Sequence, residues 1–189
     1  LMNTGRAQYR QAQVTTRYRP SEGAEVNVSY AWSRARGDLN TLSDTLIPVQ
    51  APVIRPNAYG IQPSDVPHRV IAWGYLHLPL KLVVAPVADM HSGFSYSNVD
   101  VLQNYVGSPN SLRFPVYFSV DAKLYRDFPL RLPFKDHSKV RKIRLGIFAL
   151  NATNHHNPHD VFNNITSPLF GRFAGFQRRF TGFVIGLGE

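Results

Sequence analysis

The fold is decided by the last stretch of the chain, Phe173-Ala-Gly-Phe-Gln-Arg-Arg-Phe-Thr-Gly-Phe-Val-Ile-Gly-Leu-Gly-Glu189. Side chains alternate between the two faces of a strand, so Phe183, Ile185 and Leu187 share one face. A continuously apolar face is typical of a wall packed against something other than bulk water, and we interpret the stretch as the closing strand of a membrane β-barrel. The opposite face is nearly bare: Gly182, Val184, Gly186 and Gly188.

The rest of the chain repeats this two-residue alternation and shows almost no helical periodicity. We therefore expect an all-β fold, an antiparallel up-and-down meander of about seven strands that forms a C-terminal segment of a large transmembrane β-barrel. The clearest strand begins at Ala24, where the alternation assigns Val26, Val28 and Tyr30 to lipid, and Asn27 and Ser29 to the lumen. The expected strands are 7–18, 24–33, 68–78, 80–96, 116–126, 140–151 and 173–189.

The connections between these strands alternate in length. Segments 37–67, 97–115 and 152–172 are long, whereas the links near 19–23 and 79 are short and the link at 127–138 is intermediate. Outer-membrane barrels join their strands by short periplasmic turns and longer external loops. Loop length and strand parity thus agree on which end of the sheet lies outside the cell.

Composition narrows the function classes. The chain has 21 Lys and Arg against 12 Asp and Glu, but they are spread along strands and turns, which argues against a nucleic-acid surface. It contains no cysteine, so a disulfide scaffold and a cysteine-based zinc site are excluded. No apolar run approaches the roughly 20 residues of a membrane helix. We expect the 189 residues to be one fragment of a longer protein, without its plug domain.

Several short motifs resemble the C-terminal barrel region of TonB-dependent outer-membrane receptors, closest to the Oar-like branch. The resemblance covers most of the chain and is strongest from His68 onward. It rests on Arg69, Leu112-Arg-Phe-Pro-Val-Tyr-Phe-Ser-Val-Asp-Ala-Lys123, Arg126-Asp-Phe128, Phe148-Ala-Leu-Asn-Ala-Thr-Asn-His-His-Asn-Pro158, Asn163-Asn164 and Ser167-Pro-Leu-Phe-Gly171.

This resemblance implies a barrel of roughly 22 strands in the cell outer membrane that moves a bulky ligand. It also implies its partners: outer-membrane lipid, the rest of the barrel and its plug, the TonB energy-coupling complex through an N-terminal region, and the barrel assembly machinery. No nucleic acid is expected. Such barrels often end in an aromatic residue, whereas this chain ends in Leu187-Gly-Glu189.

The sequence offers few residues for chemistry. We expect no enzymatic activity, no cofactor and no metal site, because no nucleophile motif, paired carboxylates or phosphate loop is present. The His-rich segment gives the candidate ligand-contacting residues His155, His156, Asn157 and His159, which we interpret as part of a polar external loop. The aromatic residues favour an interfacial girdle over a sugar-binding face: Tyr30, Trp32, Trp73, Tyr75 and Phe183.

A second class of function remains open at this point. The same alternation is found in a soluble, secreted β-sandwich, which would act as a carbohydrate-binding module. A sandwich buries one face of each strand in a core between two sheets, whereas a barrel wall exposes its apolar face to lipid. The arrangement of the strands therefore separates the two hypotheses.

Overall fold

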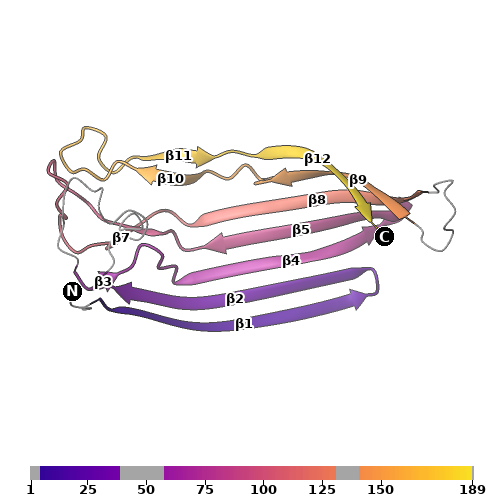
Figure 1. Ribbon diagram of the computed structural model, residues 1–189, viewed down its shortest axis with the longest axis horizontal. Coiled ribbons are helices and arrows are strands. Elements are labelled where there is room, and N and C mark those ends of the chain that lie inside the picture. The colour runs from indigo at the N-terminus through magenta and orange to yellow at the C-terminus, as the bar shows by residue number, and fades with distance from the viewer. Residues whose placement is uncertain (1–4, 39–57, 131–140, 189) are drawn as a thin grey trace.

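The computed structural model describes residues 5–38, 58–130 and 141–188. Its main sheet contains seven long strands, each paired antiparallel with the next long strand along the chain (Figure 1). This confirms the predicted meander. The long strands are β1 (Ala7–Ser21), β2 (Ala24–Gly37), β4 (His68–Leu78), β5 (Leu82–His91), β8 (Tyr117–Leu130), β9 (Arg141–Leu150) and β12 (Phe180–Gly188).

The ends of the sheet differ in their connections. At one end, Glu22 and Gly23 join β1 to β2, and a 3-10 turn, η1 (Pro79–Lys81), joins β4 to β5. At the other end, called the rim below, the chain leaves the sheet after β2, β5 and β9 (Figure 1). The long connections therefore share one end, as loop length and strand parity predict.

Short strands lie within these long connections. β3 (Gly60–Ile61) pairs with the end of β2, and β6 (Ser95–Tyr96) pairs with β7 (Leu112–Arg113). β10 (Asn157–Val161) pairs with β11 (Phe173–Gln177) in a separate hairpin. The sequence analysis placed long connections here and did not predict these short strands. An isolated parallel bridge, between Val99 and Asn164, joins two loops outside the named strands.

The closing stretch is two strands rather than the single predicted one. β11 leaves the main sheet, and only β12 pairs with β9. The break falls at Arg178 and Arg179, where the Arg179 backbone N–H donates to Asn154 Oδ1 at 3.1 Å instead of to a neighbouring strand. The fourth strand begins two residues later than predicted, because Leu80 lies in the left-handed region with φ 64°, and it ends at His91 rather than at residue 96.

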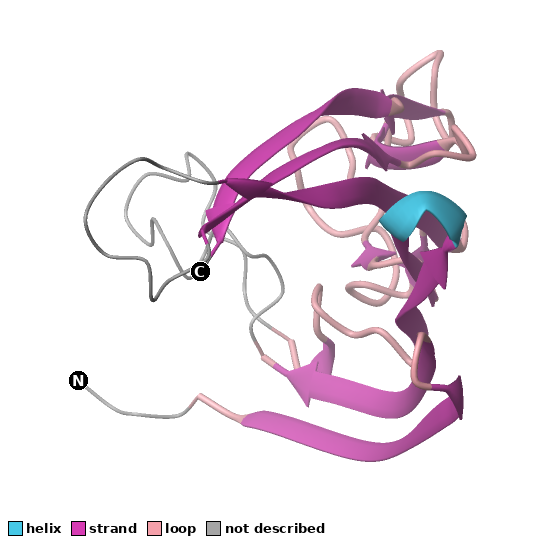
Figure 2. Ribbon diagram, turned by 90° about the vertical axis from the view of Figure 1, so that its right-hand side faces the viewer, coloured by secondary structure: helices cyan, strands magenta, loops and turns pink. Residues whose placement is uncertain are grey.

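The strand registers define two faces. We call the face that carries Val28, Ala72, Ala88 and Leu124 the outer face, and the opposite face the inner face. Viewed along the strands, the sheet is a single curved layer, with loops on its hollow side (Figure 2). Val26, Val28 and Tyr30 lie on the outer face as predicted; their exposed fractions are 48%, 40% and 41%, whereas Asn27 and Ser29 on the inner face are 8% exposed.

The described residues contain almost no apolar core. Only Ala24, Ala35 and Val99 are buried apolar residues, while many large apolar side chains of the outer face are exposed. A sandwich requires a second sheet packed on this face, and the described chain places none there. The soluble-sandwich alternative is therefore wrong. Among the described residues, no helix has the length and apolar character needed to cross a membrane.

Candidate functional site

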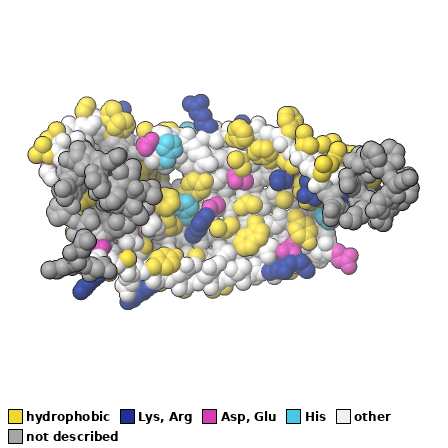
Figure 3. Space-filling model, viewed as in Figure 1, with side chains coloured by type: hydrophobic (Ala, Val, Ile, Leu, Met, Phe, Trp, Pro, Cys, Tyr) yellow, Lys and Arg dark blue, Asp and Glu magenta, His cyan; other side chains and the backbone are white. Residues whose placement is uncertain are grey.

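The inner face of β1, β2, β4 and β5 holds a polar hollow of about 520 Å³ close to the rim. Charged and imidazole side chains lie among apolar ones on the face that Figure 3 shows. The hollow can present both hydrogen-bonding groups and rings to a ligand. Its lining residues are Tyr9, Gln11, Gln13, Ser29, Ala31, Ser33, Ser64, Val66, Arg69, Ile71, His91 and Phe94.

A chain of side-chain hydrogen bonds runs along one wall of the hollow. Tyr9 Oη donates to Gln11 Oε1 at 2.9 Å, and Gln11 Nε2 donates to Gln13 Oε1 at 3.1 Å. Gln13 Nε2 donates to Ser29 Oγ at 2.8 Å, and Thr15 Oγ1 reaches the same oxygen at 3.0 Å. The four residues from Tyr9 to Thr15 lie two apart on β1, so the alternation of the strand places them in a row, and Ser29 is the cross-strand partner of Thr15 on β2. The row offers amide and hydroxyl groups, which bind neutral polar ligands.

Ion pairs flank this row on the inner face. The Arg69 guanidinium holds Asp89 with two hydrogen bonds, at 3.1 and 2.7 Å, across β4 and β5. Near the short turns, Glu25 accepts from Arg17 at 2.6 Å and from Arg19 at 2.5 Å. Pairing these carboxylates with guanidinium groups keeps the wall polar and compensates their charge.

The loops are attached to the rim end of the inner face by an ion pair whose carboxylate is buried. The Asp65 side chain is 2% exposed, and its Oδ1 accepts from the backbone N–H of Ala35 in β2 at 2.5 Å. Its Oδ2 accepts from Arg113 Nη2, while Arg113 Nη1 donates to the Asp65 carbonyl at 2.8 Å and to the Gly93 carbonyl at 3.1 Å. This cluster therefore fixes two loops to each other and to the wall.

Buried amides extend the same loop layer. Asn110 is 3% exposed; its backbone N–H donates to Ser97 Oγ at 2.7 Å, and its Nδ2 donates to the Ile61 carbonyl at 2.9 Å. Asn163 Nδ2 donates to the Ser97 carbonyl at 2.7 Å, which adds the third loop. All three connections at the rim are thus cross-linked by hydrogen bonds.

An aromatic cluster supports the loop layer between β6, β7 and β11. The ring centroids of Tyr96 and Phe114 lie 5.2 Å apart, and Phe173 lies 5.5 Å from Phe114. Burial in this cluster raises the pKa of the Tyr96 hydroxyl, because desolvation disfavours the charged phenolate. The cluster supplies apolar packing to loops that otherwise depend on polar contacts.

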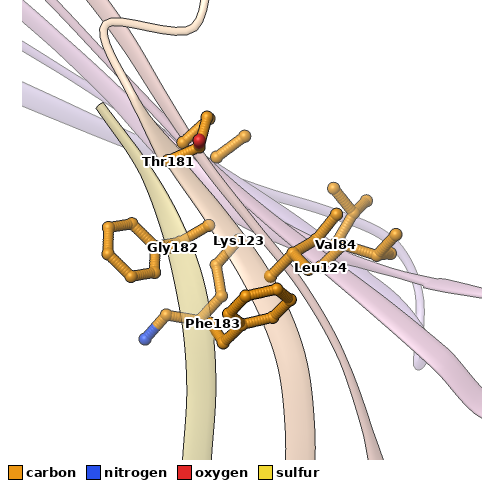
Figure 4. A pocket seen from close by; sticks show the side chains of 10 residues that line it. Val84, Lys123, Leu124, Thr181, Gly182 and Phe183 are labelled. Atoms are coloured by element: carbon orange, nitrogen blue, oxygen red, sulfur yellow. The ribbon is translucent and has the colours of Figure 1, made fainter. Parts of the chain in front are cut away.

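The outer face has the opposite character. Phe183, Ile185 and Leu187 are 82%, 78% and 78% exposed, and their register partners on β9 are also apolar. Over β5, β8, β9 and β12 the strands leave a hollow of about 320 Å³, lined mostly by apolar side chains, including Val84 and Leu124 (Figure 4). A contiguous exposed apolar surface of this extent requires a non-aqueous partner.

An apolar outer face, a polar inner face and long connections at one end together characterise the wall of a membrane barrel. The model of a family described as outer membrane beta barrel domain matches residues 1–104. The chain belongs to this family. No curated protein and no solved structure matches it. Membership of this family locates the protein in the outer membrane.

Membership of the outer-membrane barrel family gives each face its environment. The outer face lies against lipid, because its strands carry apolar side chains there, and the inner face lines the lumen. Long loops of such barrels are external, which assigns the rim to the cell surface. The polar hollow is therefore a luminal groove just below the external opening.

The predicted ligand-contacting residues do not converge on one point. The His155 ring packs edge-on against Phe118, at 5.7 Å, and its Nδ1 lies 3.0 Å from Asn157 Oδ1. His156 packs against Phe176 and His159 pairs with Asp160. In the described part of the chain, no three His, Cys, Asp or Glu side chains are arranged to hold a metal ion.

Asn157 has a structural position rather than an exposed one. It is 3% exposed; its Nδ2 donates to the Phe118 carbonyl at 2.8 Å, and the Phe118 N–H donates to its Oδ1 at 3.0 Å. Asn151 is fully buried, and its Nδ2 donates to the His155 carbonyl at 2.9 Å. The Asn-rich motif therefore turns the chain at the rim and docks the β10–β11 hairpin on β8. His156 and His159 remain exposed on the same hairpin.

Sequence reasoning missed the luminal groove and the Asp65–Arg113 pair. It also placed Trp73 and Tyr75 in the interfacial girdle, which was wrong, because these two residues pair with Asn27 and Glu25 on the inner face. The two-residue alternation already places Trp73 on the opposite face of the strand from Val70 and Ala72. Following that alternation across the sheet would have assigned both aromatic residues to the lumen.

Proposed function

We propose that this chain forms part of the barrel of a TonB-dependent outer-membrane receptor of the Oar-like branch, which moves a bulky ligand across the outer membrane. The observation that carries the proposal is the luminal groove, a polar hollow of about 520 Å³ beneath loops joined by the Asp65–Arg113 pair. A groove of this kind suits capture of a polar ligand from the cell exterior before it passes through the lumen.

Sheet parity indicates that the described strands are only part of a closed barrel. Seven antiparallel strands leave the first and last of them, β1 and β12, running in the same direction (Figure 1). Closing the sheet with antiparallel pairs alone therefore requires an odd number of further strands, and bacterial barrels have even totals. Barrels of about eight strands are filled by their own side chains, so passage of a bulky ligand needs a larger one.

The remaining features of the proposal concern partners. The 189 residues are one C-terminal part of the barrel, and the plug and the segment that contacts the TonB complex belong to other parts of the protein. The outer face binds lipid, the barrel assembly machinery inserts the barrel, and no nucleic acid is bound. The role is transport without enzymatic chemistry and without a cofactor.

Conductance of the full-length protein in a planar lipid bilayer tests the proposal. A plugged receptor should conduct very little at first and should open when moderate urea unfolds the plug, because the barrel strands are more resistant than a separate soluble domain. An unplugged porin of the same barrel would conduct immediately. Immediate conductance without urea would contradict the receptor proposal and favour a passive pore.

Cross-linking supplies a second test that does not need the ligand. Full-length protein, mixed with the periplasmic domain of TonB, should form a cross-linked complex that is lost when the segment N-terminal to the plug is deleted. A barrel without energy coupling would give no complex in either form, which would contradict the proposal.

A further inference from the structure

The outer row of β2 changes character along its length. From the short turns toward the rim it reads Val26, Val28, Tyr30, Trp32, Arg34 and Arg36. Successive members of one row are two residues apart, which is about 6.8 Å along a strand. The order is that of a bilayer leaflet: hydrocarbon, then the aromatic interface, then the head-group layer. The two arginines therefore lie at the level of the external head groups.

The neighbouring strand adds a third arginine to the same place. Arg10 of β1 is directly opposite Arg34 in the register, and Gln8 is opposite Arg36. All three arginines are exposed, and Lys and Arg side chains appear at this end of β1 and β2 in Figure 3. Like charges placed opposite each other destabilise a sheet, so an anion bound between the two guanidinium groups would stabilise this strand pair.

Described carboxylates do not provide that anion. None of the ion pairs among the described residues includes Arg10, Arg34 or Arg36. The nearest acidic residue along the chain is Asp38, two residues after Arg36 and just beyond the end of β2. Its Oδ2 accepts a hydrogen bond from the backbone N–H of Arg6 at 2.8 Å. At the other end of the outer face, Arg126 lies 4.9 Å from the Phe128 ring rather than beside another guanidinium.

We propose that Arg10, Arg34 and Arg36 form a binding site for the phosphate groups of anionic lipids in the external leaflet. A guanidinium binds phosphate through two parallel N–H donors, and two adjacent guanidinium groups can share one phosphate or bind two neighbouring ones. Tyr30 and Trp32, directly below in the row, would contact the start of the acyl chains. The site depends on the barrel lying in the membrane, and it does not depend on which ligand the lumen carries.

Lipid retention by the full-length protein tests this proposal. The protein is placed in nanodiscs that contain phosphatidylcholine with a minor fraction of phosphatidylglycerol, and it is then transferred to detergent and examined by native mass spectrometry. Wild-type protein should retain phosphatidylglycerol in preference to phosphatidylcholine. R34Q/R36Q should weaken this retention by about tenfold for each guanidinium removed, since charge-assisted hydrogen bonds are lost.

Arg178 and Arg179 provide a matched control. They are exposed, lie at the same end of the chain's sheet and carry the same charge, but they belong to the link before β12. R178Q/R179Q should therefore retain lipid as the wild type does. R34K/R36K, which keeps the charge and loses the paired donors, should give intermediate retention. Heat-modifiability on gels checks that each variant is folded.

Two outcomes would overturn the proposal. One is equal loss of phosphatidylglycerol from R34Q/R36Q and R178Q/R179Q, which would reduce the effect to net charge. The other is a wild-type protein that shows no preference between the two lipids. If R34Q/R36Q does not fold, two other variants decide. Retention of phosphatidylglycerol at the wild-type level by both R34K/R36K and, separately, R10Q would count against the site.

Discussion

Asp65 and Arg113 are 48 residues apart in the sequence and form an ion pair that joins two external loops to the wall of the barrel. The Asp65 side chain is 2% exposed, whereas that of Arg113 is 29% exposed. A carboxylate so deeply buried needs its partners, because loss of a partner leaves an uncompensated buried charge. The pair therefore holds the loop layer over the luminal groove.

Removal of one member of this pair should loosen the loops. Arg113→Gln should expose the loop segments to protease, because among the described residues the Asp65 carboxylate is then left with only the Ala35 N–H. Asp65→Asn should have a similar effect, since it loses the charge that attracts the guanidinium. Limited proteolysis of the full-length protein in detergent micelles measures both variants.

The double variant Asp65→Asn/Arg113→Gln separates pairing from general damage. Because the residues are in direct contact, the effect of the double variant should be smaller than the sum of the single effects, with a coupling of about 0.5–3 kcal/mol. Purely additive effects would contradict a functional pair. Arg69→Gln, which breaks a pair on the open inner face, should leave loop cleavage unchanged.

The Asn-rich motif should depend on its asparagines more than on its histidines. Asn157→Ala removes both hydrogen bonds to the Phe118 backbone, and leaving those groups without partners costs about 1–3 kcal/mol. His156→Ala removes an exposed ring that packs on Phe176, so its effect should be small. Hydrogen exchange of the Phe118 amide should rise strongly in the first variant and little in the second. Equal increases would mean that Asn157 does not dock the hairpin.

Strand positions were predictable because the two-residue alternation is local. His68–Leu78 was predicted with the observed bounds, and the faces of β8 and β9 follow directly from their sequences. The alternation is strong in these strands because one face meets lipid and the other meets water. A local pattern of this strength needs no information from the rest of the chain.

The loop layer could not be predicted in the same way. The contacts of Asp65 with Arg113 and of Asn110 with Ile61 join residues that are 48 and 49 apart, and no local pattern marks either pair. β10 carries Pro158 and alternates too weakly to be recognised as a strand. Asn157 was interpreted as a ligand contact because Asn is polar, but its amide satisfies backbone groups of β8. The same residue type serves either role, so only the fold distinguishes them.

Cysteine labelling should establish the orientation of the sheet. The sequence contains no cysteine, so single variants report one site each. Thr166→Cys, exposed in a connection at the rim, should react with a membrane-impermeant maleimide on intact cells. Glu22→Cys, exposed in the turn between β1 and β2, should react only after the outer membrane is permeabilised. The reverse result would invert the assignment. From the sequence alone, Ser43 and Asn157 are predicted labelling sites in the external loops, but Asn157 is too buried for this purpose and Ser43 lies outside the described residues.

Insertion of a charge at mid-membrane should distinguish the two faces of the sheet. Along the outer row of β2, Val28 lies midway between Ala24 near the turn and Trp32 in the interface. An arginine that faces lipid at mid-membrane costs roughly 2–4 kcal/mol, because the hydrocarbon cannot hydrate it. Val28→Arg should therefore sharply reduce the yield of folded full-length protein in liposomes, measured by heat-modifiability on gels.

Thr15 provides the luminal control at nearly the same depth. Thr15 is exposed and pairs with Ser29 on the inner face. The next residue, Thr16, pairs with Val28, so Thr15 and Val28 lie at nearly the same depth. Asn27 is less suitable, because its Nδ2 donates to the buried Glu25 at 2.9 Å. Thr15→Arg loses the hydrogen bond from the Thr15 hydroxyl to Ser29 Oγ, but Gln13 Nε2 still donates to that oxygen. The new guanidinium stays in water. Folding yield should remain near that of the wild type. Equal damage from Val28→Arg and Thr15→Arg would mean that both faces are buried against protein, and the assignment of the outer face to lipid would then be wrong.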